Sequence, residues 1–273
     1  AGSEAIRVDS SGRMLIGGTS SHNQYGSQSS LQVQGTGFDD STISLRRDQN
    51  NANPPGLIFA KSRSGSTGGS TIVQDDDQIG TLLFAAADGT DLTSLAAEIK
   101  VEIDNTPGSN DVPGRIVLKT TSDGGSSPTE RLRITSRGGF QFSNGFMNET
   151  VKINTTARTG TQAVNLDDGM VHYFSSNSTG TWKPNFTMSS GDDINSTLAT
   201  GDVFSPTMIV AKGADTHFAN SAEVDGTTIG SIEFLGGAPT DGGASGTFDV
   251  YNYTIIKIGN DSFKAFVSVS TYE

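Results

Sequence analysis

The chain has 273 residues, of which 33% are hydrophobic and 18% charged, and it contains 34 Gly and no Cys. The lack of Cys excludes a disulfide scaffold, a thiolate metal site and a cysteine nucleophile. The net charge of −12 argues against binding along a nucleic-acid backbone, and no apolar run approaches the roughly 20 residues of a membrane span. The low hydrophobic content predicts a thin core, which favours a chain that completes its burial against copies of itself.

The first half of the chain shows strand periodicity, with apolar residues two apart in short runs. Clusters of Gly, Pro, Asn, Ser and Asp separate these runs and predict turns. The predicted strands cover residues 6–8, 14–16, 31–33, 43–45, 56–60, 79–84, 97–103 and 115–119. Residues 91–100 also place apolar residues on one helical face, but they continue into an alternating run. We therefore predict a strand there that could begin with one helical turn.

One sequence repeat brackets this region. Residues 4–16 (EAIRVDSSGRMLI) align without gaps with residues 130–142 (ERLRITSRGGFQF). Each segment predicts a β-hairpin whose turn glycine, Gly12 or Gly138, adopts a positive φ. We predict a β stalk module over residues 1–142 and a second domain over residues 143–273.

The second domain carries most of the aromatic residues and most of the excess negative charge. Its strands are predicted at residues 170–174, 186–188, 207–211, 228–235, 247–258 and 263–270. The last two form a hairpin around the turn at residues 259–261. This spacing of strands and turns predicts an all-β chain whose second domain is a jelly-roll-like β-sandwich.

Several segments resemble those of bacteriophage tail fibres, notably of marine and cyanobacterial phages. They are residues 6–13 (IRVDSSGR), 53–63 (NPPGLIFAKSR), 80–91 (GTLLFAAADGTD), 106–115 (TPGSNDVPGR) and 127–136 (SPTERLRITS), and residues 236–240 and the closing hairpin resemble fibre ends more loosely. The resemblance implies a homotrimeric fibre of the virion, exposed to the medium and joined to other tail or virion proteins, whose tip contacts the host surface. Because the chain begins with Ala1 rather than Met, we expect a fragment of a longer fibre, with a processed chain as the alternative. Many such fibres end in a self-cleaving chaperone domain, which has no counterpart in this sequence.

No catalytic motif stands out in the sequence. It contains no G-x-S-x-G, H-E-x-x-H or P-loop pattern, and its three His residues are scattered. Asp-rich stretches at residues 75–77, 167–168 and 192–193 are interpreted first as solvated turns. Calcium binding is a weaker alternative, because hard cations prefer carboxylate oxygens, and a glycosidase acid pair is weaker still. We expect no enzymatic activity and no cofactor.

Trp182, Lys183 and Asn185 are the candidate receptor contacts. Trp182 is the only Trp and lies beside a Ser-, Thr- and Gly-rich stretch. Aromatic rings can stack on sugar faces, and polar side chains can hydrogen-bond hydroxyl groups. The competing interpretation makes Trp182 a core residue of the sandwich. We predict a non-enzymatic virion fibre that binds host surface glycan through its second domain. The alternatives are a glycan-degrading tailspike and a purely architectural head, neck or baseplate fibre.

Overall fold

The computed structural model describes residues 4–189, 192–240 and 245–272. Strands are almost the only regular secondary structure of the described residues, which confirms the all-β prediction. The chain divides into two compact units between Met147 and Asn148, shortly after the predicted boundary at residue 143. Neither of the two short helices among the described residues, η1 (Leu166–Asp168) and α1 (Ile194–Thr197), has the length that a membrane span requires.

The first unit opens with a small three-stranded sheet. Its strands are β1 (Ile6–Val8), β2 (Met14–Ile16) and β3 (Leu31–Val33), with β1 antiparallel and β3 parallel to the central β2. Leu15 and Gln32 are buried on one face of this sheet, at 0% and 4% exposure. The alternation of side chains along a strand then sends Val8 to the other face, where it is 70% exposed.

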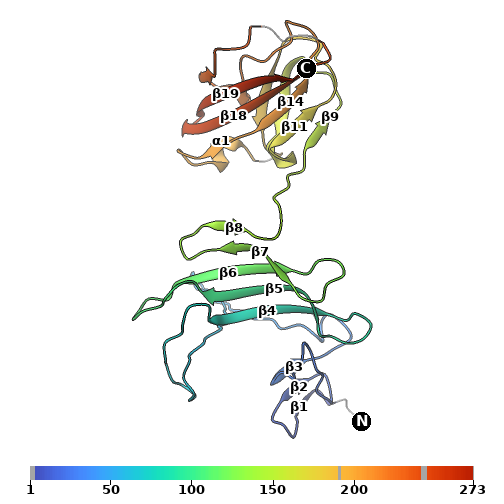
Figure 1. Ribbon diagram of the computed structural model, residues 1–273, viewed down its shortest axis with the longest axis vertical. Helices are drawn as coiled ribbons and strands as arrows, with labels where there is room; N and C mark the ends of the chain where they lie inside the picture. The colour runs from blue at the N-terminus through green and yellow to red at the C-terminus, as the bar shows by residue number, and fades with distance from the viewer. Residues whose placement is uncertain (1–3, 190–191, 241–244, 273) are drawn as a thin grey trace. The chain divides into compact units, whose positions relative to one another are not determined.

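A second, antiparallel sheet follows in the same unit. It runs in chain order through β4 (Gln78–Ala86), β5 (Ser94–Ile103), β6 (Gly114–Thr120), β7 (Thr129–Ile134) and β8 (Phe140–Phe142), as Figure 1 shows. This is an antiparallel meander, in which each strand returns beside the one before it through a connecting loop. The residues predicted to hold a helical turn belong to an exposed loop and to β5 instead.

The two repeated segments form hairpins of matching register. Residue pairs Ile6–Ile16 and Val8–Met14 in the first correspond to Leu132–Phe142 and Ile134–Phe140 in the second. In both hairpins the turn glycine has a positive φ, +76° at Gly12 and +78° at Gly138. Each hairpin also carries an ion pair between residues three apart, Arg7 with Glu4 and Arg133 with Glu130. The sequence repeat is therefore a structural repeat as well.

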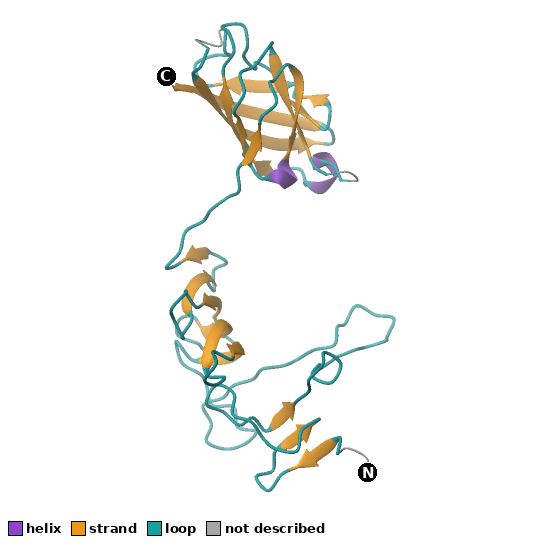
Figure 2. Ribbon diagram, turned by 90° about the vertical axis from the view of Figure 1, so that its right-hand side faces the viewer, coloured by secondary structure: helices purple, strands orange, loops and turns teal. Residues whose placement is uncertain are grey.

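Two strand predictions in the first unit are wrong. Residues 43–45 and 56–60 belong to no strand and lie in the long segment between β3 and β4, which is drawn as loop in Figure 2. Their apolar side chains are exposed, with Ile43 at 66% and Ile58 at 87%. Alternation alone predicted strands there, but a strand also needs a neighbour, and these residues pair with none among the described residues.

The second unit is a sandwich of two sheets. The smaller sheet contains, in spatial order, β10 (Gly160–Asn165), β12 (Trp182–Thr187), β15 (Glu223–Val224) and β16 (Thr227–Thr228). The larger sheet contains β17 (Ser231–Phe234), β19 (Ser262–Tyr272), β18 (Phe248–Gly259), β14 (Thr207–Ala211), β11 (Val171–Phe174) and β9 (Lys152–Asn154), with β13 (Val203–Phe204) added on β18. The β18–β19 hairpin turns at Asp261, which has a φ of +49°.

The strand pairing in this sandwich is mixed. Parallel neighbours occur in both sheets, as between β10 and β12 and between β11 and β14. A jelly roll is built of antiparallel sheets, so the arrangement differs from the jelly-roll type that the strand spacing suggested. Turn spacing in the sequence indicates where strands end but not which strands pair.

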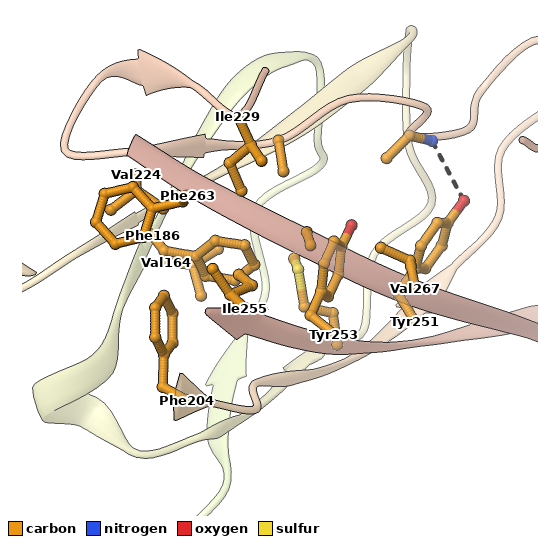
Figure 3. Packing of buried hydrophobic residues seen from close by; sticks show 14 of the residues in the cluster. Val164, Phe186, Phe204, Val224, Ile229, Tyr251, Tyr253, Ile255, Phe263 and Val267 are labelled. Atoms are coloured by element: carbon orange, nitrogen blue, oxygen red, sulfur yellow. Dashed lines mark hydrogen bonds between the residues drawn. The ribbon is translucent and has the colours of Figure 1, made fainter. Parts of the chain in front are cut away.

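Aromatic rings fill the space between the two sheets (Figure 3). Phe186 from the smaller sheet meets Tyr253 from the larger one edge to face, with ring centroids 5.1 Å apart. The hydroxyl of Tyr251 accepts a hydrogen bond of 3.2 Å from the backbone N–H of Ala219, drawn as a dashed line in Figure 3. Edge-to-face contacts and a partner for the buried hydroxyl are both favourable in a core.

Candidate functional site

The structure contradicts the prediction that Trp182 is a surface contact. Its side chain is 3% exposed and belongs to the core of the sandwich. The ring meets Tyr251 edge to face at a centroid distance of 5.5 Å. Because the ring is buried in the folded chain, it cannot stack on a sugar. Trp182 is therefore a core residue, as the competing interpretation held.

Strand alternation separates Trp182 from the other two candidates. In β12 the residues Trp182, Pro184 and Phe186 are buried, whereas Lys183 and Asn185 are partly exposed. Successive side chains of a strand point to opposite faces, so Lys183 and Asn185 lie together on the outer face of the smaller sheet. The structure therefore brings two of the three candidates onto one surface.

Lys183 and Asn185 are both held by neighbours on that face. The Lys183 ammonium forms an ion pair with Glu223 on β15, the neighbouring strand of the same sheet. The Asn185 carbonyl oxygen accepts a hydrogen bond of 2.9 Å from the backbone N–H of Gly226, and its amide nitrogen has no partner among the described residues. These contacts fix the rotamers of both side chains and leave the N–H groups of the Asn185 amide available as donors.

The rest of this outer face is small and polar. Strand register adds side chains of β10, β12 and β16 to it, which are Thr161, Ala163, Asn165, Thr187 and Thr228. Hydroxyl and amide groups of this kind can exchange hydrogen bonds with sugar hydroxyls. The face carries no aromatic side chain among its described residues, so it offers hydrogen bonds without a stacking platform.

A buried arginine, which no pattern in the sequence indicates, supports the core beneath this face. Arg158 is 0% exposed, and its guanidinium carbon lies 5.1 Å from the Phe174 ring centroid and 5.2 Å from that of Trp182. Its Nη1 donates to the Ser176 carbonyl at 3.2 Å, and its Nη2 donates to the Ala211 carbonyl. Burial lowers the pKa of Arg158 to about 10, which still leaves it charged at neutral pH. This arginine has a structural role.

The Asp-rich stretch at residues 75–77 is tied into the first unit by its own contacts. Asp76 pairs with Arg115 at 2.6 Å, and Asp77 pairs with Arg63 at 2.7 Å. The hydrogen bonds from Arg63 hold the pKa of Asp77 well below its usual range. These carboxylates serve turns and ion pairs.

The other two Asp-rich stretches also serve local structure. Asp167 accepts a hydrogen bond of 2.6 Å from the backbone N–H of Ser189, and Asp193 caps the N-terminus of α1. In the part of the chain that the structure describes, no three His, Asp or Glu side chains converge as a metal site would require.

Comparisons with known proteins show only weak similarity, and it lies among solved structures. No protein-family model and no curated protein matches the chain. Among solved structures, it is similar to the carboxy-terminal domain of the L-shaped tail fibre of bacteriophage T5, at 17% sequence identity and a TM-score of 0.39. The match covers 53% of this chain and 61% of that one, which is less than two thirds of its length. It is a weak, tail-fibre-like similarity.

Proposed function

We propose that this chain is a segment of a phage virion fibre that assembles as a homotrimer and presents its second unit to a glycan on the host surface. The first unit supplies the contacts between copies and is joined to other tail or virion proteins. The second unit binds the glycan without cleaving it.

The single observation that supports assembly into a homotrimer concerns the five-stranded sheet, which exposes apolar side chains on one face and buries charged side chains on the other. Cross-strand neighbours form two apolar rows across it, the first made of Leu82, Ile99, Leu118, Leu132 and Phe142, the second of Val101, Ile116, Ile134 and Phe140. On β5, Ile99 and Val101 of these rows are 37% and 38% exposed, whereas Lys100 on the opposite face is only 7% exposed. A sheet normally buries its apolar face and exposes its polar one.

The opposite face of the same sheet needs no partner. Lys100 pairs with Glu102 at 2.6 Å, Arg115 with Glu102 at 2.9 Å, and Lys119 with Glu98 at 3.0 Å. The first pair lies within β5 and the other two join β6 to β5, so these charges are satisfied within one chain. Burial of the apolar rows against a second and third copy then removes the remaining exposed hydrophobic surface from water.

The first hairpin repeats this arrangement. Ile6 and Val8 are 57% and 70% exposed, on the face opposite the buried Leu15. In the repeat they correspond to Leu132 and Ile134, which belong to the apolar rows of the larger sheet. The same open apolar surface at both ends of the unit supports contacts between copies along its whole length. The expectation that the assembly contains three copies comes from the resemblance to tail fibres.

The polar outer face of the smaller sheet supports glycan binding by the second unit. Lys183, Asn185 and their neighbours offer hydroxyl and amide groups on rigid strands. Contacts of this kind are individually weak, of order millimolar for a few sugar rings, but three chains in each fibre multiply them. A glycan-degrading tailspike and a purely architectural fibre are the alternatives. No described group of side chains specifically favours either of them.

Two measurements on the full chain test the proposal. Multi-angle light scattering is expected to give the mass of a trimer at micromolar concentration, and a monomer would refute the assembly part. An array of bacterial surface polysaccharides is expected to retain the labelled protein. Retention on none of them would favour the architectural alternative, and shortening of a retained polysaccharide would favour the tailspike.

A further inference from the structure

We infer that a hollow around Phe266, on the outer face of the larger sheet, is a binding site for a neutral hexopyranose ring. This inference rests on the proposed glycan binding and adds a place for it. The hollow has a volume of about 440 Å³, within the range of roughly 300–1,000 Å³ that is usual for small-ligand sites. Side chains from β17, β18 and β19 line it.

An exposed aromatic ring forms one side of the hollow. Phe266 is 44% exposed, although Phe263 and Val267 on the same strand are buried in the core. Leu235, which follows β17 directly, is 82% exposed and also lines the hollow. The π face of an aromatic ring is negative, so it attracts the weakly positive C–H groups on the apolar face of a sugar.

Polar groups surround this ring. The cross-strand partner of Phe266 on β18 is Thr254, and that of Ser268 is Asn252. On the other side, Glu233 of β17 is the parallel neighbour of Phe266. Residues that face each other across neighbouring strands point to the same side of the sheet, so all four polar side chains border the ring.

Most of these polar groups have hydrogen-bonding capacity to spare. Asn252 accepts a hydrogen bond of 3.1 Å from the Thr207 hydroxyl through its carbonyl oxygen, which leaves its amide nitrogen as a donor. Neither the Thr254 nor the Ser268 hydroxyl has a partner among the residues that the structure describes. Together they offer donors and acceptors to the hydroxyl groups of a sugar.

A lysine orders the ring and the carboxylate. The Lys264 ammonium lies 5.2 Å from the Phe266 ring centroid and 3.7 Å from a carboxylate oxygen of Glu233. A cation over the ring and an ion pair hold both groups in place before a ligand binds. The two charges also cancel, which fits a neutral sugar better than an anionic one.

The surroundings argue against an apolar partner such as a second copy. An apolar surface laid over Phe266 would take Asn252, Thr254 and Ser268 out of water without hydrogen bonds, which is costly. A pyranose ring satisfies both requirements, because one face is apolar and its rim carries hydroxyl groups. The hollow is separate from the polar face that holds Lys183, which belongs to the other sheet.

The test uses the full chain and saturation-transfer NMR with the methyl glycosides of glucose, galactose, mannose and N-acetylglucosamine. At least one is expected to receive saturation from the wild type. Phe266→Ala is expected to weaken its apparent affinity about tenfold, and Phe266→Tyr to restore most of the loss. The matched control is Tyr272→Ala, since Tyr272 is another exposed aromatic residue on the same face of β19, outside the hollow.

Several outcomes would overturn the inference. Equal binding by Phe266→Ala and wild type, or equal losses in Phe266→Ala and Tyr272→Ala, would remove Phe266 from the site. A change in the mass of the assembly in Phe266→Ala would instead identify the hollow as a contact between copies. If the wild type and Phe266→Ala bind a polysaccharide array equally well, this site is refuted and the proposed function is left intact. If no methyl glycoside receives saturation from the wild type, this site is refuted. If the polysaccharide array also retains no wild-type protein, the proposed glycan binding is refuted as well.

Discussion

The guanidinium of Arg158 lies against the face of Trp182, with its carbon 5.2 Å from the ring centroid. Both side chains are buried, and the arginine also contacts the Phe174 ring from β11 of the other sheet. The pair therefore connects the two sheets of the second unit through cation–π contacts inside the core. Trp182, which the sequence analysis proposed as a receptor contact, instead packs in the core that holds the two sheets together.

Trp182→Ala is expected to destabilise the second unit by about 3–5 kcal/mol, the usual cost of removing a large buried aromatic side chain. The loss includes the contacts of the ring with Tyr251 and Arg158. Urea denaturation followed by tyrosine fluorescence measures it. Trp182→Phe is the matched control and is expected to lose less than half as much. A Trp182→Ala variant as stable as wild type would contradict the core assignment.

The sequence contains enough information to predict that the Trp182 side chain points into the core. In the stretch WKPNFT, apolar residues alternate with Lys183, Asn185 and Thr187, which is strand periodicity with one buried face. The predicted strand began only at Phe186, so the alternation was not extended back to Trp182. With the strand drawn from residue 182, Lys183 and Asn185 remain candidates and Trp182 does not.

Other features could not be predicted from one sequence. Ile43 and Ile99 look alike in a hydrophobicity pattern, yet only Ile99 lies in a sheet, because pairing depends on residues distant in the chain. The outward direction of Phe266 is different, because Phe263, Ala265 and Val267 alternate with it and mark the other face as the core. What one sequence does not show is that β17 pairs with β19 beside Phe266.

The buried ion pair between Lys212 and Asp249 gives a second prediction. The two charges are 3.0 Å apart, and both side chains are at most 5% exposed. Asp249 also accepts a hydrogen bond of 2.8 Å from the Thr271 hydroxyl. Asp249→Asn is expected to cost about 3–5 kcal/mol, because it leaves the Lys212 charge buried without a counter-charge.

The double variant Lys212→Met, Asp249→Leu is the control for this pair. Removing both charges avoids an unpaired one, so the double variant is expected to be more stable than Asp249→Asn alone. Chemical denaturation of the three proteins measures the difference. A double variant that loses more stability than the single one would show that the pair contributes net stabilisation.

The apolar face of the first unit gives a third prediction, with a control next to it in sequence. Leu82 and Leu83 are 44% and 40% exposed, but they point to opposite faces of β4. Leu82→Gln is expected to raise the dissociation constant of the assembly at least about tenfold, since each buried leucine contributes roughly 1.5–3 kcal/mol. Leu83→Gln is expected to leave it unchanged. Sedimentation velocity over a dilution series measures both, and equal effects would place the interface elsewhere.

Acid is expected to destabilise the first unit through its ion-paired carboxylates. Hydrogen bonds from Arg133 lower the pKa of Glu130, and those from Arg63 lower that of Asp77. A lowered folded-state pKa contributes stability that is present above the unfolded-state pKa of roughly 4 and is lost as pH falls below it. Thermal unfolding between pH 7 and pH 3 is expected to show this loss. Glu130→Gln is expected to flatten the pH dependence, and an unchanged slope would remove Glu130 as a cause.

Asp225 in the second unit is expected to behave in the opposite way. Burial raises its pKa, and the charges of Asp193 and Asp261 raise it further, although it accepts a hydrogen bond of 3.0 Å from the Asn195 backbone N–H. A raised folded-state pKa favours the protonated carboxyl in the fold, so stability falls as pH rises from the unfolded-state value through the folded one. Asp225→Asn keeps an acceptor for the Asn195 N–H and removes the charge. It is therefore expected to stabilise the second unit slightly at pH 7 and to have no such effect at pH 3.

Asp202→Asn is the control for this prediction, because the Asp202 carboxylate also accepts a hydrogen bond from a backbone N–H, that of Ala199 at 2.8 Å. A loss of stability in Asp225→Asn at pH 7 would show that the charged form of Asp225 is the one the fold prefers.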